Sequence, residues 1–166
     1  YPKMPEAHLG MAKAMELGDP EKSQAAFGEV LKVNPGSPEA ALFLADQLIG
    51  SEQYDKAQAT LKLALDVNSQ NAKALSLLAS INYLSGNKDE YNKLVQKVLQ
   101  TNPGYSELYF TLADNSVSNR LYKEAVAFAR EAVRIKPNDY KSMALLGVNL
   151  MRIGEEDGGR AMLDKA

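Results

Sequence analysis

Apolar side chains recur every three or four residues along most of the chain, in stretches that short polar turns separate. This spacing places the apolar residues on one face of an α-helix, and no segment alternates apolar and polar residues as a half-buried strand would. The pattern predicts an all-helical protein with helices over residues 5–17, 20–33, 37–49, 53–67, 71–84, 88–101, 105–118, 122–135, 139–152 and 155–166.

Capping residues stand where these helices are expected to begin and end. Asp19-Pro20 and Ser37-Pro38 each place a capping side chain before a proline at the first helical position. Gly18, Gly86 and Gly154 follow helical stretches, and glycine readily takes the left-handed conformation that ends a helix. The predicted helices are therefore joined by short, well-defined turns.

The same signals repeat with a period of 34 residues. Pro35, Pro103 and Pro137 close the segments LKVNP, LQTNP and VRIKP, and Ser69 takes the missing place in LDVNS. A second series runs through the turns at Gly18, Glu52, Gly86, Arg120 and Gly154. A third series follows five residues later at Ser23, Ala57, Tyr91, Ala125 and Gly159. Most members of the third series are small, which lets two helices cross closely, so the chain is predicted to consist of repeated helix pairs.

These features resemble the tetratricopeptide repeat family, through the period, the small residues at the helix crossing and the closing proline. The resemblance covers nearly the whole chain, residues 1–166, as one array with units near 4–37, 38–71, 72–105, 106–139 and a truncated 140–166. It implies an all-α fold, a right-handed α-solenoid of helix–turn–helix repeats. The first helix of the first unit is out of phase by one residue, and three units lack the early alanine of the second helix.

Composition excludes several classes of chemistry. A net charge of −2 removes the usual electrostatic reason to expect nucleic acid as a partner, and the absence of cysteine excludes disulfides and thiolate metal sites. His8 is the only histidine, and no nucleotide-binding or metalloprotease motif occurs. No apolar run approaches the ~18 residues that span a bilayer. We therefore expect no enzyme, cofactor, metal or membrane insertion; the compartment, cytoplasmic or periplasmic, stays open.

The resemblance also implies a ligand groove, because in this family the first helix of each pair lines the concave side. The residues that this assigns to the groove are Leu42, Asp46, Ile49, Ser76, Ser80, Tyr83, Phe110, Asp114, Val117, Val148, Met151 and Arg152. The apolar members have an alternative role as core residues, which is the commoner one for Leu, Val or Met at helical spacing. Asp46 and Asp114 are stronger candidates, since carboxylates seldom serve packing, although either could be solvated or cap a neighbouring backbone group.

The expected partner is a protein or peptide, with two basic groups that pair with Asp46 and Asp114. Helix spacing puts these carboxylates roughly 20 Å apart, a distance that about six extended residues cover. Members of the family that bind chaperone tails use a Lys and an Asn four residues apart. Leu42 and Asp46, or Phe110 and Asp114, stand at those places here, so recognition of a free C-terminal carboxylate is not expected.

Three functions follow as alternatives. The first is a scaffold or adaptor that binds a partner in its groove. The second is an accessory array in a larger enzyme or a secretion or assembly machine; residues 152–166 resemble repeats that accompany a metallopeptidase module in some large bacterial proteins. The third is self-association through exposed repeat ends. The start at Tyr1 without Met, and the end at Ala166 within a unit, lead us to expect a fragment of a longer protein.

Overall fold

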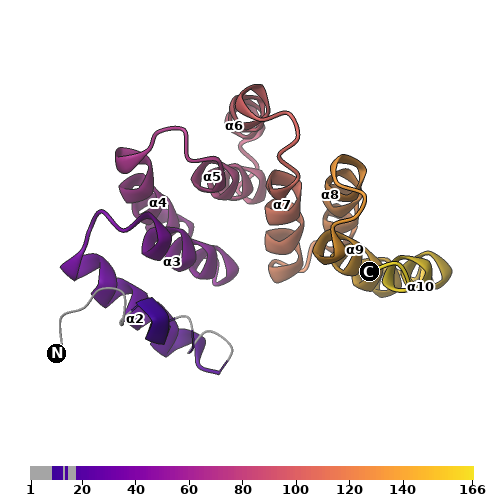
Figure 1. Cartoon of the computed structure of the whole chain (residues 1–166), viewed down its shortest axis with the longest axis horizontal. Helices are drawn as coiled ribbons and strands as arrows, with labels where there is room; N and C mark the ends of the chain where they lie inside the picture. Colours follow the sequence, from indigo (N-terminus) through magenta and orange to yellow (C-terminus); the bar gives the residue numbers. More distant parts are fainter. Residues whose placement is uncertain (1–8, 13, 15–17) are drawn as a thin grey trace. The chain divides into compact units, whose positions relative to one another are not determined.

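The computed structural model describes residues 9–12, 14 and 18–166, and every regular element among them is an α-helix (Figure 1). The helices are α2 (Pro20–Val33), α3 (Pro38–Gly50), α4 (Tyr54–Val67), α5 (Ala72–Leu84), α6 (Lys88–Thr101), α7 (Glu107–Ser118), α8 (Tyr122–Ile135), α9 (Tyr140–Arg152) and α10 (Glu156–Leu163). Residues 9–12 and 14 are also helical, and the rest of the predicted helix over 5–17 lies outside the described residues. The predicted all-α class is confirmed.

The helices begin where the capping signals predicted. The Asp19 carboxylate accepts a hydrogen bond from the Lys22 amide at 3.1 Å, and the Ser37 hydroxyl accepts one from the Ala40 amide at 3.3 Å. In both cases a proline at the first helical position follows the cap. These side chains satisfy amide groups that have no partner inside the helix.

The largest difference at a helix end is at the C-terminus of α10, which ends at Leu163 rather than 166. There the Lys165 amide donates to the Met162 carbonyl and the Ala166 amide to the Leu163 carbonyl, each at 3.2 Å. Both bonds span three residues, so the last turn is tighter than an α-helix.

One type of turn recurs every 34 residues and joins α3 to α4, α5 to α6, α7 to α8 and α9 to α10. Its long hydrogen bond, from an amide to a carbonyl five residues earlier, measures 2.8 to 2.9 Å and joins Gln53 to Leu48, Asn87 to Asn82, Leu121 to Ser116 and Glu155 to Leu150. The residue before each of these amides has a positive φ, at Glu52 (60°), Gly86 (75°), Arg120 (61°) and Gly154 (88°). This is the Schellman arrangement that ends many helices. The turns are therefore equivalent although two of them lack glycine.

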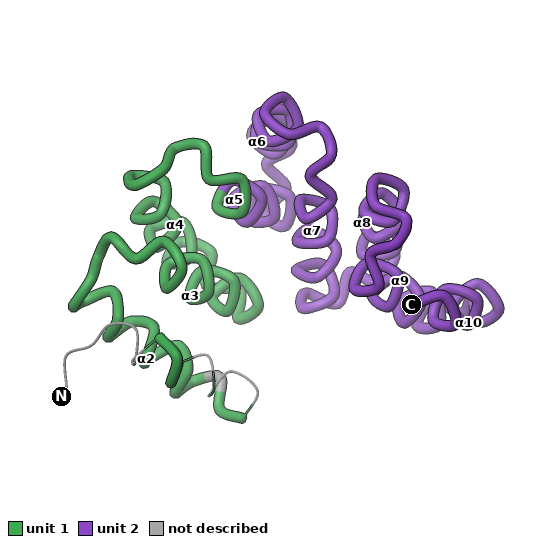
Figure 2. The backbone as a smooth tube through the Cα atoms, viewed as in Figure 1, with its two compact units in different colours: residues 1–74 green, residues 75–166 purple. Residues whose placement is uncertain are grey.

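The chain divides into two compact units, residues 1–74 and residues 75–166 (Figure 2). The first unit contains α2, α3 and α4, with a core of Ala12, Phe27, Val30 and Ala40. The ring of Phe43 stacks on the ring of Phe27, with centroids 5.5 Å apart and planes 2° from parallel. These contacts bury the apolar faces of α2 and α3 against each other.

The second unit contains most of α5 together with α6 to α10, and its core draws on three consecutive helices. Ala113 of α7, Val126 and Ala129 of α8, and Leu146 and Leu150 of α9 form one buried cluster. The division into two units leaves the prediction of a single array over residues 1–166 as a prediction.

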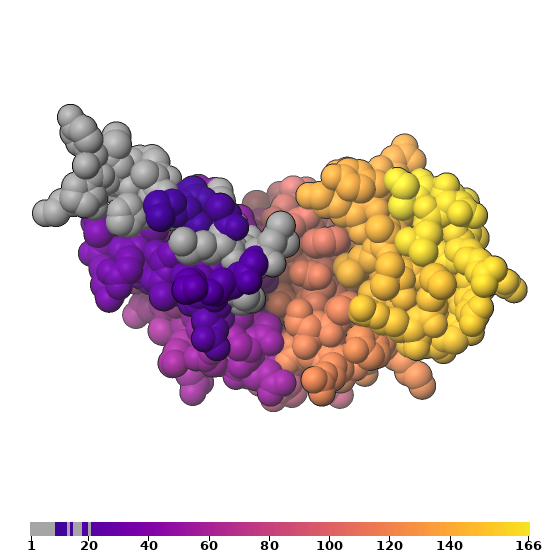
Figure 3. Space-filling view, turned by 90° about the horizontal axis from the view of Figure 1, so that it is seen from below, coloured from indigo at the N-terminus to yellow at the C-terminus, as the bar shows by residue number. Residues whose placement is uncertain are grey.

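The last helix pair of the second unit crosses through glycine. Gly147 of α9 and Gly159 of α10 are buried, and a Cβ atom on either would lie within 2.9 Å of the other's carbonyl oxygen. The remaining surface of α10, at the yellow end of Figure 3, is largely exposed, including Leu163. The predicted role of a small residue at position 159 thus has a direct steric basis.

Candidate functional site

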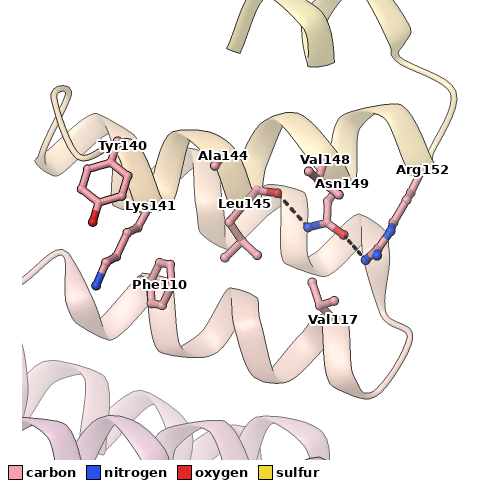
Figure 4. A pocket seen from close by; sticks show the side chains of 9 residues that line it. All are labelled: Phe110, Val117, Tyr140, Lys141, Ala144, Leu145, Val148, Asn149 and Arg152. Atoms are coloured by element: carbon pink, nitrogen blue, oxygen red, sulfur yellow. Dashed lines mark hydrogen bonds between the residues drawn. The ribbon is translucent and has the colours of Figure 1, made fainter. Parts of the chain in front are cut away.

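A pocket of about 430 Å³ lies within the second unit, between α7 and α9 (Figure 4). Its lining is mostly apolar, and Val148 and Tyr140 leave 41% and 61% of their surface exposed. The full lining consists of Phe110, Val117, Tyr140, Lys141, Ala144, Leu145, Val148, Asn149 and Arg152. Exposed apolar surface in a concave site is what a ligand would bury.

Helical spacing explains why these residues converge. Phe110 and Val117 are seven residues apart on α7, about two helical turns, so they lie on one side of that helix. On α9 successive lining residues are one or three positions apart from Tyr140 to Arg152. The pocket is therefore formed by one stripe from each of two neighbouring first helices.

The start of α9 is fixed by Asp139. Its carboxylate accepts hydrogen bonds from the Ser142 amide at 3.0 Å and from the Ser142 hydroxyl at 2.6 Å. Lys136 approaches the same carboxylate at 3.4 Å. The Ser142 hydroxyl hydrogen bond holds the pKa of Asp139 below its usual value, and the Ser142 amide and Lys136 lower it further, against the opposing effect of burial. This cap sets the positions of Tyr140 and Lys141 at one end of the pocket.

The opposite end of the pocket holds a positioned arginine. Arg152 Nη1 donates to Asn149 Oδ1 at 3.2 Å, and the guanidinium carbon lies 5.2 Å from the centroid of the Tyr122 ring. Asn149 is 1% exposed, and its Nδ2 donates to the Leu145 carbonyl at 2.7 Å, so its orientation is fixed. The guanidinium is therefore held by a hydrogen bond and a cation–π contact while Arg152 stays exposed.

The structure brings four of the predicted groove residues together in this pocket: Phe110, Val117, Val148 and Arg152. Asp114 lies on α7 between the first two and is exposed, although it is not among the lining residues. Met151 is 40% exposed, but its Cγ is so close to Gly159 that a Cβ there would overlap it. Met151 therefore faces α10 rather than the pocket.

The other predicted residues lie elsewhere. On α3, Leu42 and Asp46 are half-buried, whereas Ile49 is fully buried. Ser76 and Ser80 of α5 are buried as well, and the Ser80 hydroxyl accepts a 3.5 Å hydrogen bond from Asn115 Nδ2. Ile49, Ser76 and Ser80 are thus interior side chains with no exposed surface for a ligand. The candidate site therefore does not include them.

Tyr83 belongs to a cluster of aromatic rings in the second unit. Its ring meets Phe128 edge-on at 4.9 Å and Tyr91 at 5.3 Å between centroids. Burial is the main cause that raises the pKa of Tyr83, with a smaller effect of Glu124. Tyr91, at the place where other units carry a small residue, is more deeply enclosed, and burial raises its pKa to about 12. Packing accounts for both rings.

Sequence reasoning missed five residues of the pocket: Tyr140, Lys141, Ala144, Leu145 and Asn149. All five precede Val148 or Arg152 on α9 at helical spacing, so extending the predicted stripe toward the helix start would have found most of them. Asn149 shares this spacing, but its role as a hydrogen-bond partner depends on how the Arg152 side chain lies.

A second pocket, of about 460 Å³, lies beside α8 and the turn before α10. Arg130 and Glu155, which both line it, form an ion pair at 3.0 Å. The pair offsets the charge of Arg130 and leaves Lys123 as the other charged residue of the lining.

No cluster of three or more His, Cys, Asp or Glu side chains suited to a metal ion occurs among the described residues. His8, the only histidine, lies outside the residues that the structure describes. None of the described helices has the length and apolar character needed to cross a membrane.

Profiles of the tetratricopeptide repeat family match residues 14–81 and 106–139, which together exceed half of the chain. The chain is 26% identical over 141 residues to the BBSome complex member BBS4 of Bos taurus, covering 85% of this chain and 27% of that protein. It is 29% identical over 92 residues to an uncharacterized protein of Sinorhizobium fredii, covering 55% and 50%. The chain thus spans half or less of the length of these relatives.

Solved structures share the fold. A thermophilic TPR protein of Thermus thermophilus matches with a TM-score of 0.70 and 18% identity, over 98% of this chain and 90% of that one. MamA matches with a TM-score of 0.59 and 20% identity, over 97% of this chain and 88% of that one. YrrB is described as a TPR protein with an unusual peptide-binding site. It matches with a TM-score of 0.56 and 16% identity, over 95% of this chain and 82% of that one. At these identities the likeness concerns the fold alone.

Proposed function

Because the chain belongs to the tetratricopeptide repeat family, we propose that it acts as an interaction scaffold and binds a segment of a partner protein between α7 and α9. The observation that carries this proposal is the pocket of about 430 Å³ with exposed apolar side chains on two first helices. Burial of such surface is the main favourable contribution to most protein association.

Other features of the fold agree with a binding role. The cap at Asp139 and the buried cluster shared by α7, α8 and α9 support the pocket walls. A preformed site loses less conformational entropy on binding than a flexible one. Members of this family and fold are typically interaction modules without catalytic activity, and we propose no catalytic role for these residues.

The test compares two exposed valines. Val148→Gln removes apolar surface from the pocket. Val67→Gln makes the same change outside it, at the last residue of α4, which is 57% exposed. Proteins captured from a lysate by each immobilised chain are quantified by mass spectrometry, and each candidate is then titrated in purified form by calorimetry. A partner that binds the wild type and Val67→Gln but loses affinity for Val148→Gln supports the proposal. Equal affinity for all three chains contradicts it.

The charge preference of the partner is a separate part of the proposal. Asp46 is half-buried on α3 and Asp114 is exposed on α7, and both are proposed to pair with basic groups of the partner. Reversing both charges with Lys should weaken a complex that depends on them. Unchanged affinity in calorimetry would discard the role of these carboxylates and leave the apolar pocket in place.

A second candidate function is an accessory region within a larger protein. The chain spans 27% and 50% of the two relatives named above, one of which is described as a BBSome complex member. Under this alternative the array positions a neighbouring module, as also proposed from residues 152–166. Deleting residues 107–152 from that larger protein would then prevent its modules from assembling, and would leave the binding of a separate partner protein unchanged.

Self-association is the third candidate, through the exposed surface of α10. Leu163 is 37% exposed and lies at the end of that helix. Light scattering over a range of concentrations tests it: a mass that rises with concentration and falls after Leu163→Gln supports the proposal, and a constant monomer mass contradicts it.

A further inference from the structure

The pocket between α7 and α9 has a positive charge at each end. Lys141 stands in the first turn of α9 and Arg152 is its last residue, so about 16 Å of helix axis separates them. None of the nine described residues that line the pocket is acidic. Figure 4 shows the Lys141 side chain reaching toward the Phe110 end of the pocket and Arg152 at the other end.

The acidic residues that flank α9, Asp139 at its N-cap and Glu155 at the N-cap of α10, are already engaged. The Asp139 carboxylate binds Ser142 and Lys136, and the Glu155 carboxylate pairs with Arg130 at 3.0 Å. Neither therefore serves as the partner of a pocket cation. Charge complementarity accordingly favours a negatively charged ligand at both ends.

Arg152 is arranged to receive a carboxylate. Its Nη1 donates to Asn149 and its guanidinium lies over the Tyr122 ring, so few rotamers remain to be lost on binding. A guanidinium offers further N–H donors in the geometry that suits the two oxygens of a carboxylate. The buried Asn149 is thus a positioning residue for this end of the pocket.

The middle of the pocket is apolar. Ala144, Leu145 and Val148 lie between the two cations along α9, and Phe110 and Val117 face them from α7. A ligand that satisfies both ends must therefore place an apolar side chain between its acidic groups. An extended chain advances about 3.3 Å per residue, so two acidic residues about five positions apart match the distance between the cations.

We propose that this pocket selects an extended segment of a partner protein in which a large apolar residue lies between two acidic residues about five positions apart. The inference rests on the proposed function and specifies its ligand. It differs from the pairing of Asp114 with basic groups, because Asp114 lies outside the pocket lining while Lys141 and Arg152 form part of it.

The test selects peptides without assuming a sequence. Random dodecapeptides displayed on phage are selected on the immobilised 166-residue chain, and the enriched peptides are synthesised with a fluorescent label. Their affinity is measured by anisotropy for the wild type, for Lys141→Gln with Arg152→Gln, for Val148→Gln and for the control Val67→Gln. Circular dichroism checks that each variant is folded.

The expected peptides contain the acidic–apolar–acidic pattern. The double variant Lys141→Gln with Arg152→Gln loses charge-assisted hydrogen bonds at both ends of the pocket and should bind these peptides roughly tenfold or more weakly. Replacing the acidic residues of the peptides with Gln should have the same effect. Val67→Gln should leave their affinity within about twofold. Asn149→Leu should weaken binding in the same direction as Arg152→Gln, whereas Asn149→Gln should restore part of it.

Two results would overturn the inference in different ways. If basic peptides are enriched, or if acidic peptides bind the double variant as tightly as the wild type, the inference is wrong. The proposed function survives that result as long as Val148→Gln still reduces affinity. If no enriched peptide is sensitive to Val148→Gln, both the inference and the proposed pocket fail.

Discussion

Gly147 of α9 and Gly159 of α10 meet backbone to backbone. A Cβ atom on Gly147 would lie 2.9 Å from the Gly159 carbonyl oxygen and 2.8 Å from Leu163 Cγ, while one on Gly159 would lie 2.8 Å from the Gly147 carbonyl oxygen. Side chains at such crossings normally keep helices about 8–10 Å apart between axes. The absence of both side chains is what lets α10 dock on α9.

We predict opposite effects for two neighbouring glycines of α10. Gly159→Ala places a methyl group against backbone atoms and should lower the free energy of unfolding by about 1–3 kcal/mol. Gly158→Ala meets only Leu150 Cδ1 at 3.7 Å, an ordinary contact, and should raise it by about 0.5–1 kcal/mol, because alanine is the better helix former. Urea unfolding of both variants checks this, and a decrease for both would show that the crossing is not the cause.

Glycine should stabilise two of the turns. Glu52 and Arg120 have φ of 60° and 61°, in the left-handed region where a Cβ atom costs about 1–2 kcal/mol. Glu52→Gly and Arg120→Gly relieve this strain but add freedom to the unfolded chain, so a net gain of about 0.5 kcal/mol is expected. Glu52→Ala keeps the Cβ atom and is the control. Thermal unfolding compares the three, and equal stability of Glu52→Gly and Glu52→Ala would contradict the prediction.

Tyr91 should make the protein less stable at high pH. Burial raises its folded-state pKa to about 12 from the ordinary value of 10.0, so the unfolded chain releases this proton first. Stability from this group is complete below pH 10 and decreases as the pH rises toward 12. Absorbance at the phenolate band should show a late-titrating component in the wild type that Tyr91→Phe lacks. Its persistence in that variant would assign it to another tyrosine.

The Asp139 cap should act at the opposite end of the pH scale. Its pKa is lowered by the Ser142 hydrogen bonds and Lys136, so its contribution is present above the ordinary value of 3.8 and is lost as pH falls through the lower folded-state pKa. Asp139→Ala should cost about 1 kcal/mol at neutral pH. Urea unfolding at neutral pH and at a pH well below the folded-state pKa measures the cost, which should shrink in acid; a cost independent of pH would contradict the role of the charged cap.

Much of the fold could be predicted from the sequence because its signals are local. Caps such as Ser37 and the spacing of apolar residues act within one or two helical turns, and the helix bounds follow from them. The conformation of Glu52 could be inferred only from its register with Gly86, since its residue type disfavours a positive φ. Period, rather than composition, carried that information.

The site was harder to predict because helical spacing does not say what covers a stripe. Ser76 and Ser80 are small and polar, and such residues fit either in a groove or between packed helices, where the structure places them. Val148 and Arg152 were assigned correctly to a first helix. Their pocket also depends on Asn149, which accepts a hydrogen bond from Arg152 and so positions its guanidinium.

The contact between Arg152 and Tyr122 also gives the molecule an optical reporter. The chain contains eight tyrosines and no tryptophan, so tyrosine emission is not masked by a stronger fluorophore. A carboxylate that pairs with the guanidinium would offset the positive charge over the ring and so change the surroundings of Tyr122. Occupancy of the α7–α9 pocket could then be followed in unlabelled protein, as the difference in emission between the wild type and Tyr122→Phe.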